Sequence, residues 1–300
     1  GIPHIVFAVN KMDLVDWSEE RFREIRDDIE DFLPKLDTFS DVKFLPLSAL
    51  DGGNVVDPSE YTPWYEGPTL MGHLESVHIA SDWNLNAFRF PVQWVNRPNN
   101  PTDKTLHDFR GFSGQIAGGI IKVGQEVLVL PGGRKSFIKE IQTFDGKLDE
   151  AFSPQSVTLI LEDDLDISRG DMIVGTDSLP GHSADVSARV CWMEQRPLQA
   201  GQKYFLKQGT QTVQAKVISL DSRINIRTYE PEPHPAELAM NDIGEVRLRT
   251  AKPLVFDGYT TNRLTGSIVL VEPSTNATVA AGMLRGPEKV YQPEYDDFMI

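Results

Sequence analysis

Two kinds of hydrophobic pattern divide this chain of 300 residues. Near its beginning, residues 5–9 form a continuous apolar run, which is typical of a central parallel strand covered on both faces. Residues 18–33 then place apolar side chains at helical spacing, and residues 42–47 follow as a second strand. The order strand, helix, strand predicts a βαβ unit, and a last helix is expected over residues 69–77.

From about residue 83 onward the pattern changes to short apolar runs separated by Gly and Pro, which is typical of small β-barrels. The predicted barrel strands are residues 88–95, 114–117, 126–130, 156–161, 188–193, 212–218, 244–248 and 266–271. We therefore expect an α/β plus all-β fold, with an α/β domain over residues 1–82, β-barrels over 83–181 and 182–285, and a flexible tail over 286–300. The Pro-rich stretch 230–235 is interpreted as a surface connection.

Four residues, three of them polar, follow the first strand, where an open α/β sheet collects its ligands. Asp13 could accept two hydrogen bonds at once from the ring N–H and the exocyclic amine of guanine, a pair that adenine does not offer. Asn10 could bond a base nitrogen and brace the loop, and the stem of Lys11 could lie along the base plane. Met12 has no specific task in this interpretation, and an ordinary turn rich in Asn and Asp is the alternative.

A second loop strengthens the guanine hypothesis, because Ser48, Ala49 and Leu50 end the next predicted strand. The two loops together resemble the last two nucleotide motifs of translation-factor-type GTPases. The resemblance implies that GTP is the ligand and that the backbone N–H of Ala49 bonds the guanine carbonyl. The expected base-binding residues are Asn10, Lys11, Met12, Asp13, Ser48, Ala49 and Leu50.

Composition and charge narrow the function classes further. Hydrophobic residues make up 40% of the chain, which suits several globular cores, and no apolar run approaches the roughly 18 residues of a membrane span. A net charge of −15 disfavours a large nucleic-acid surface. The single cysteine, Cys191, is expected to be a buried strand thiol, which fits a reducing cytoplasm. Six histidines show no metal-ligand spacing, so we expect no metal site in this chain.

The barrel region carries motifs that resemble the large, GTPase subunit of bacterial sulfate adenylyltransferase. These motifs are residues 96–99, 108–114, 143–146, 162–171, 190–193, 241–244 and 275–283, and the resemblance runs from about residue 1 to residue 283. It implies a partial P-loop-type GTPase domain followed by two β-barrels. It also implies that GTP hydrolysis drives the synthesis of adenylylsulfate from ATP and sulfate, with adenylyl transfer on a separate small catalytic subunit.

Two departures from the family pattern shape the expectations. The phosphate loop and the Mg²⁺ ligands of the family would precede residue 1, so we expect no catalytic residue in this chain and little activity from it alone. Residues 101–107 are interpreted as a neutral loop insertion. Two alternatives stay open at this point, namely a translation factor that binds tRNA and a non-catalytic β-barrel interaction module.

Overall fold

A computed structural model of the chain describes residues 4–35, 41–77, 84–98, 109–287 and 291. The chain separates into two compact units, residues 1–82 and residues 83–300, and each is described by itself below. The expected insertion over 101–107 and most of the expected tail lie outside the described residues.

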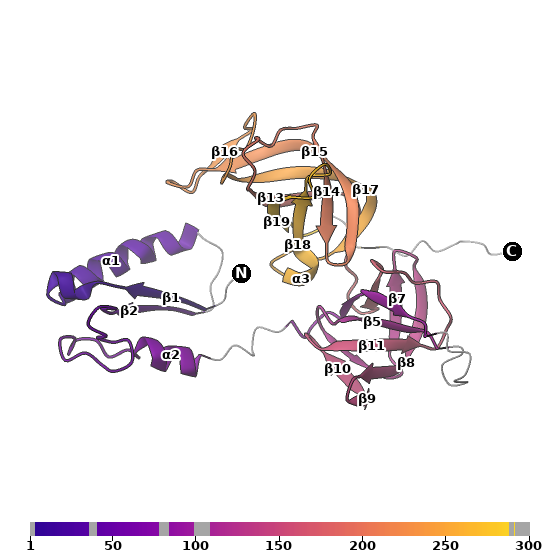
Figure 1. Cartoon of the computed structure of the whole chain (residues 1–300), viewed down its shortest axis with the longest axis horizontal. Helices are drawn as coiled ribbons and strands as arrows, with labels where there is room; N and C mark the ends of the chain where they lie inside the picture. Colours follow the sequence, from indigo (N-terminus) through magenta and orange to yellow (C-terminus); the bar gives the residue numbers. More distant parts are fainter. Residues whose placement is uncertain (1–3, 36–40, 78–83, 99–108, 288–290, 292–300) are drawn as a thin grey trace. The chain divides into compact units, whose positions relative to one another are not determined.

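The first unit is built on a parallel pair of strands (Figure 1). Strand β1 (His4–Val9) lies beside β2 (Asp41–Pro46), and the two are paired in register from His4 with Asp41 to Val9 with Pro46. The connection between them runs through the 3-10 turn η1 (Met12–Val15), helix α1 (Glu19–Phe32) and the turn η2 (Leu33–Lys35). This is the predicted strand–helix–strand order.

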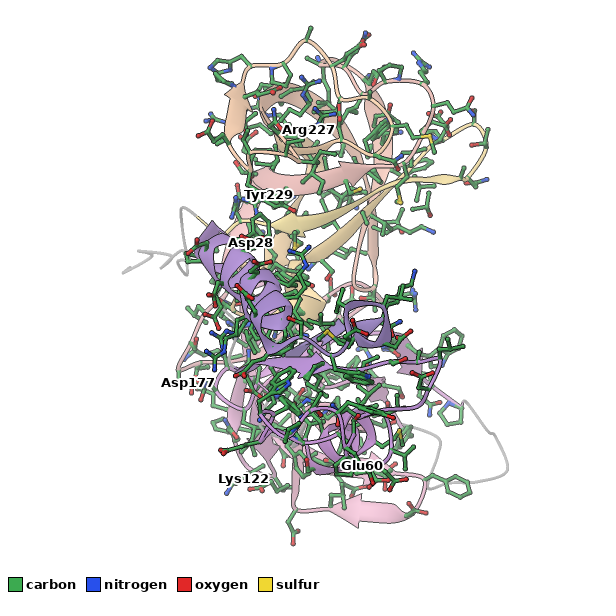
Figure 2. All side chains as sticks on the ribbon, turned by 90° about the vertical axis from the view of Figure 1, so that its left-hand side faces the viewer. Asp28, Glu60, Lys122, Asp177, Arg227 and Tyr229 are labelled. Carbon is green, nitrogen blue, oxygen red and sulfur yellow. The ribbon has the colours of Figure 1, made fainter. Side chains whose placement is uncertain are left out.

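Helix α1 begins where the sequence predicts it. Ser18 caps the helix by accepting a hydrogen bond from the backbone N–H of Arg21 at 3.2 Å, and two glutamates follow in the first turn. Phe22 on its inner face is buried in a core with Val9, Met12 and Trp17. Trp64 packs on that core, with its ring centroid 5.3 Å from that of Phe22. The opposite face is polar and carries Asp28, which is labelled in Figure 2. Helix α2 (Leu70–Ser76) closes the unit.

The second unit contains two curved antiparallel sheets. The strands of the first are β3 (Arg89–Pro91), β4 (Trp94–Asn96), β5 (Gly111–Gln115), β7 (Glu126–Leu130), β8 (Arg134–Thr143), β9 (Gly146–Leu148), β11 (Ser156–Leu161) and β12 (Met172–Gly175). A short pair, β6 (Ile120–Lys122) with β10 (Glu150–Phe152), lies beside them. The large sheet runs β3-β12-β7-β8-β11-β5-β4, with β9 on β8.

This sheet curls round on itself. Strands β3 and β4 are consecutive pieces of one segment, yet they lie at the two opposite ends of the strand order, β3 beside β12 and β4 beside β5. The predicted single strand over residues 88–95 is therefore wrong in one respect: it is broken after Pro91. At the break, the N–H of Val92 donates to Asp171 O at 2.9 Å while the N–H of Gln93 donates to Ser113 O at 2.9 Å. The chain changes its neighbour there, which closes the barrel.

The second sheet is a closed barrel. Its elements are β13 (Gly181–Trp192), β14 (Lys203–Gln208), β15 (Gln211–Ile224), β16 (Pro231–Pro233), β17 (Ile243–Phe256), helix α3 (Arg263–Gly266), β18 (Ser267–Val271) and β19 (Thr278–Leu284). The order is β14-β18-β19-β13-β17-β15-β16, and a further pairing of β14 with β15 closes it. Trp192 is the largest fully buried side chain of its core.

Two details of this barrel correct the sequence analysis. The Pro-rich stretch 230–235 includes an edge strand, β16, which an edge position permits because its prolines need not donate to a further neighbour. Cys191 is half-buried rather than buried, since in β13 it is Val190 and Trp192 that point into the core and the residue between them points outward.

A buried ion pair joins the two barrels within the second unit. Arg89, in β3, donates through Nε and Nη2 to the two carboxylate oxygens of Asp257, each at 2.9 Å. Thr265 adds a third bond to that carboxylate, and Asn262 donates to Ala117 O at 3.0 Å across the same interface. Among the residues that the structure describes, no helix is long and apolar enough to cross a membrane.

Candidate functional site

The loops that follow β1 and β2 are joined by backbone hydrogen bonds just beyond the parallel pair. The N–H of Leu47 donates to Val9 O at 2.9 Å, and the N–H of Met12 donates to Leu47 O at 3.2 Å. The parallel pairing of the two strands is thereby continued into the loops that the sequence analysis selected. The two groups of expected site residues consequently lie at one edge of the sheet.

The side chain of Asn10 bridges these loops. Its Oδ1 accepts the backbone N–H of Lys11 at 2.8 Å and the backbone N–H of Ala49 at 3.0 Å. Lys11 adopts the left-handed conformation, with φ 66°, which turns the chain sharply after the strand. Because Oδ1 is held twice, the amide has one orientation, and its Nδ2, on this exposed residue, makes no hydrogen bond with any described residue.

Asp13 is the acidic group of the site. It is the second residue of η1, its side chain is half-buried, and its carboxylate makes no hydrogen bond or ion pair with any described residue. An unpaired carboxylate of this kind presents two acceptor oxygens, which matches a ligand that offers two adjacent N–H donors. Lys11, two residues earlier, is exposed and has no ion-pair partner among the described residues.

Met12, to which the sequence analysis gave no specific task, supports the loop from below. Its side chain is only 1% exposed and packs with Val9, Trp17 and Phe22 beneath the loop. The side chain therefore faces the core, and a contact of Met12 with a base would have to be made by its backbone. Met12 anchors the loop that carries Asn10 and Asp13 by burying an apolar side chain on the core side.

The second loop is equally tight. Ser48 is completely buried, its Oγ accepts the N–H of Asp51 at 3.2 Å, and its backbone exchanges bonds with Gly52 and Gly53. Leu50, by contrast, is 86% exposed. The N–H of Ala49 was expected to bond the guanine carbonyl, but here it donates to Asn10, so a bound base would have to share or replace that bond.

Asn54 is a supporting residue that the sequence analysis described only as part of a loop. It is buried in the left-handed conformation, donates through Nδ2 to Pro46 O at 2.9 Å and to Thr62 Oγ1 at 3.0 Å, and accepts the N–H of Ser59 at 2.7 Å. The sequence signal was the string of turn-forming residues at 51–54. Asn54 fixes the long loop between β2 and α2.

The site supplies recognition groups rather than reacting groups. Its amide, carboxylate and backbone N–H groups can select a heterocyclic base by hydrogen bonding. Within the described ranges, no three His, Cys, Asp or Glu side chains come together as a metal-binding set. The loops are thus suited to base recognition, and they offer neither a metal centre nor a nucleophile with its base.

Several of the barrel motifs build turns and their supports. Asn241 is left-handed, and its N–H donates to Trp192 O at 2.7 Å, while Asp242 accepts the N–H of Ala239 at 2.8 Å. Arg110 pairs with Asp164 at 2.5 Å, which holds the pKa of that exposed carboxyl below its usual range. Parts of the motifs at 96–99 and 108–114 lie outside the described residues.

Comparison with known proteins adds close relatives. A family model described as GTP-eEF1A C-terminal domain-like matches residues 185–285. The chain is 50% identical over 301 residues to the bifunctional enzyme CysN/CysC of Rhodopirellula baltica, covering 99% of this chain and 45% of that protein. It is 49% identical over 284 residues to sulfate adenylyltransferase subunit 1 of Bacteroides fragilis, covering 95% of this chain and 58% of that protein.

Similar solved structures agree on the fold. A crystal structure of sup35 complexed with GMPPNP has a TM-score of 0.62 at 23% identity, over 96% of this chain and 70% of that one. Translation elongation factor SelB from Methanococcus maripaludis, in its apo form, has a TM-score of 0.55 at 18% identity, over 95% of this chain and 59% of that one. At these identities the likeness establishes the layout alone.

Proposed function

We propose that this chain belongs to the family of sulfate adenylyltransferase subunit 1 and that its parent protein is the GTPase subunit of that enzyme. Its α/β domain and two barrels have a translation-factor-like layout. The chain spans about half the length of the curated relatives that it matches, 45% of one and 58% of another, so activity, substrates and partners are proposed for the parent. In this proposal the parent couples GTP hydrolysis to the synthesis of adenylylsulfate from ATP and sulfate.

The base site carries the proposal. The observation that supports it best is the unpaired, half-buried carboxylate of Asp13 beside a bridge from Asn10 to Ala49. A guanine base would offer its ring N–H and exocyclic amine to Asp13 and would approach the free Nδ2 of Asn10. Lys11 and Leu50, both exposed, would flank the base on its apolar faces. Ser48 would hold the second loop in place from inside.

The described part of the chain is assigned only the base. It brings together no side-chain set for Mg²⁺, so we derive no step through a metal and assign the phosphate and Mg²⁺ contacts to other parts of the parent. The coupling has a chemical reason, because the sulfate–phosphate anhydride is high in energy and its formation requires an outside source of free energy. We further propose a separate small catalytic subunit as partner, and a cytoplasmic location where GTP and ATP are both available.

A tRNA-binding translation factor is the less supported alternative. The structures that resemble this chain include translation proteins, but at 18–23% identity they speak for the fold alone. The relatives at 49–50% identity are the bifunctional enzyme CysN/CysC and sulfate adenylyltransferase subunit 1.

The substitution Asp13→Asn in the full-length parent tests the base assignment. A carboxamide mispairs with guanine but offers an N–H to the 2-oxygen of xanthine, and each mispaired buried polar group costs about 1–3 kcal/mol. We expect weaker GTP binding and improved binding of xanthosine triphosphate, measured by calorimetric titration. Asp16→Asn is the matched control, because Asp16 is an exposed acid in the same loop, and its GTP affinity should equal that of the unaltered protein. Unchanged GTP affinity in Asp13→Asn would remove Asp13 from the base site.

A further inference from the structure

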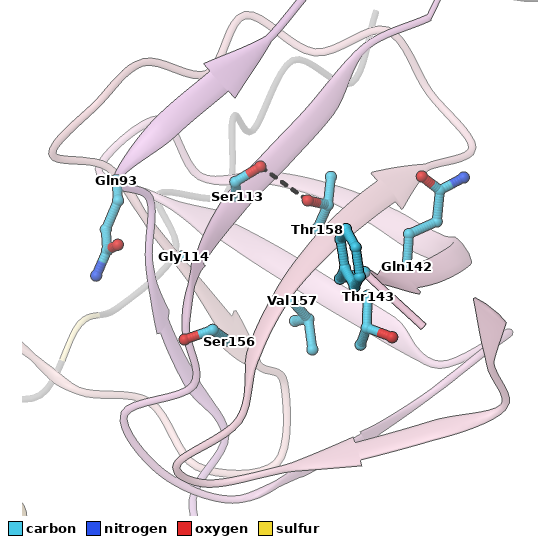
Figure 3. A pocket seen from close by; sticks show the side chains of 9 residues that line it. Gln93, Ser113, Gly114, Gln142, Thr143, Ser156, Val157 and Thr158 are labelled. Carbon is cyan, nitrogen blue, oxygen red and sulfur yellow. Dashed lines mark hydrogen bonds between the residues drawn. The ribbon is translucent and has the colours of Figure 1, made fainter. Parts of the chain in front are cut away.

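The outer face of the first barrel carries a hollow of about 380 Å³ (Figure 3). Its floor is formed by β5 and β11, with contributions from the end of β8 and from Gln93. Figure 3 shows the hydroxyls of Ser113 and Thr158 directed toward each other across neighbouring strands, and their oxygens are 2.8 Å apart. All residues that line the hollow belong to the second unit, whereas the base-site residues belong to the first.

Strand register shows that one row of side chains crosses this face. Trp94 in β4 is paired with Ser113 in β5, Ser113 with Thr158 in β11, and Thr158 with Gln142 in β8. Residues paired directly across antiparallel strands project from the same face of the sheet. The hydroxyls and the amide of this row therefore form a polar strip, and Trp94 stands at one end of it.

Two aromatic side chains flank the polar strip. Trp94 is 67% exposed, and Phe144, which lines the hollow at the tip of the β8–β9 hairpin, is fully exposed. The hairpin turn is fixed, because Thr143 donates from Oγ1 to Gly146 O at 3.0 Å. Because the side chain of Phe144 is held entirely in water, it contributes no apolar burial to the stability of this unit. Exposed aromatic side chains of this kind are typical anchors of protein interfaces.

The hollow is also free of charge. None of its lining residues is ionisable, in a chain that is 24% charged and has a net charge of −15. Charge lies at the border of the hollow, where Gln142 donates to Glu140 and the row continues from Gln142 into Lys147 of β9. Glu140 and Lys147 pair with each other. A neutral surface in an acidic protein avoids the cost of stripping water from charges and suits a segment that is itself uncharged.

We propose that this face docks the second subunit of the assembly, through an uncharged segment that lies along the polar strip, bonds to it and places one apolar side chain against Trp94 and another against Phe144. This inference rests on the proposed function, since the relatives' name of subunit 1 supports a companion subunit. A small molecule fits less well, because such ligands are enclosed on most of their surface, whereas the hollow is bordered by the fully exposed side chain of Phe144.

The test measures binding of the purified companion subunit of sulfate adenylyltransferase from the same organism to the full-length parent, by calorimetric titration. Phe144→Ala and Trp94→Ala should each weaken binding at least about tenfold, as expected for aromatic anchors. Gln142→Glu, which places a charge in the polar strip, should weaken it as well. GTP affinity should not change in any of the three. Phe137→Ala is the matched control, because Phe137 lies in β8 of the same barrel, is 48% exposed and does not line the hollow.

Each outcome separates the two proposals. If the unaltered parent does not bind the companion subunit, the proposed function fails. If it binds, and Phe144→Ala and Trp94→Ala bind as tightly as Phe137→Ala, the docking inference alone is overturned. Sedimentation of the parent without its companion adds a further arm: self-association that Phe144→Ala abolishes would assign the face to a second copy of this chain and would also overturn the inference.

Discussion

Removing the carboxylate of Asp257 should destabilise the barrel pair more than any surface substitution. Asp257 accepts two hydrogen bonds from Arg89 and one from Thr265, all at 2.9 Å, and Arg89 is only 1% exposed. The remaining bonds of the guanidinium go to the carbonyls of Phe88 and Ser178. In Asp257→Ala, Nε and Nη2 lose their acceptors while the positive charge stays buried.

The magnitude follows from that geometry. Breaking one side of a buried ion pair costs about 3–5 kcal/mol, because an uncompensated charge is left behind. Asp257→Asn keeps one acceptor oxygen for the guanidinium but removes the negative charge. We therefore expect a smaller loss in the free energy of unfolding, about 1.5–3 kcal/mol, which is the size of hydrogen bonds to charged groups. The double variant Arg89→Met with Asp257→Leu should be less destabilised than Asp257→Ala, since no buried charge remains.

Urea unfolding combined with segment-resolved hydrogen exchange would measure these effects. Because the pair joins the barrels, protection in β7 and in β17 should fall together in Asp257→Ala. A change below about 1 kcal/mol would refute the reasoning, since that is the range of exposed ion pairs. A double variant that is less stable than Asp257→Ala would refute it as well. The exposed pair Arg249 with Asp185 supplies the control, and Asp185→Ala should cost little.

Three further predictions come from single contacts. Asn10→Ala should weaken GTP binding of the full-length parent by about 1 kcal/mol or more, because the hydrogen bonds through which Asn10 joins the two loops are lost; unchanged affinity in calorimetric titration would show that the bridge is unimportant. Gly119→Ala should lower the free energy of unfolding by more than about 1–3 kcal/mol, since a Cβ would lie 2.4 Å from the backbone of Phe88 at φ +75°; urea unfolding that matches the unaltered protein would contradict this. Burial raises the pKa of Glu245, but hydrogen bonds from two arginines outweigh it and leave that pKa below its ordinary value of 4.5. The stabilisation is therefore present above the unfolded pKa and lost as pH falls through the folded one, and melting curves from about pH 3 to pH 7 should show a steeper acid loss in the unaltered protein than in Glu245→Gln.

The α/β unit was predictable because its signals are local. The apolar run of β1, the helical spacing of α1 and its Ser18 cap are all readable within a few residues of each other. The strands of the two barrels were harder to predict from the sequence. Strand β12 is buried on both faces and shows no alternation, and β6 and β9 are only three residues long, too short for a period to be visible.

One barrel strand could have been found. In β14 the buried positions Tyr204, Leu206 and Gln208 alternate with more exposed ones. Gln208, the polar residue among these three, interrupts the apolar alternation in the sequence. Its burial is possible because its Nε2 donates hydrogen bonds to the carbonyls of Val255 and Thr265. A buried amide with two acceptors is an outcome of tertiary structure, which spacing in a sequence does not reveal.

The same limit applies to the base site. Spacing placed Asn10 and Asp13 on one loop and correctly gave Asn10 a bracing role, but it could not decide which acceptor the N–H of Ala49 chooses. Nor could it show that Met12 faces the core, because a 3-10 turn following a left-handed residue has no simple period. The assignment of these residues to guanine stays a prediction.

The two loops are held in place by the protein itself, and this decides what kind of effect their residues should have. Backbone bonds from Leu47 and Met12, the buried side chain of Met12 and the bridge from Asn10 all fix the loops from within the first unit. A ligand therefore spends little of its binding free energy on ordering them. Substitutions at Asp13 should then appear mainly as changes in base selectivity, because the surrounding geometry is already set. Substitutions beneath the loop, at Met12 above all, should instead weaken binding of every base alike, since they loosen the scaffold without altering its hydrogen-bond pattern.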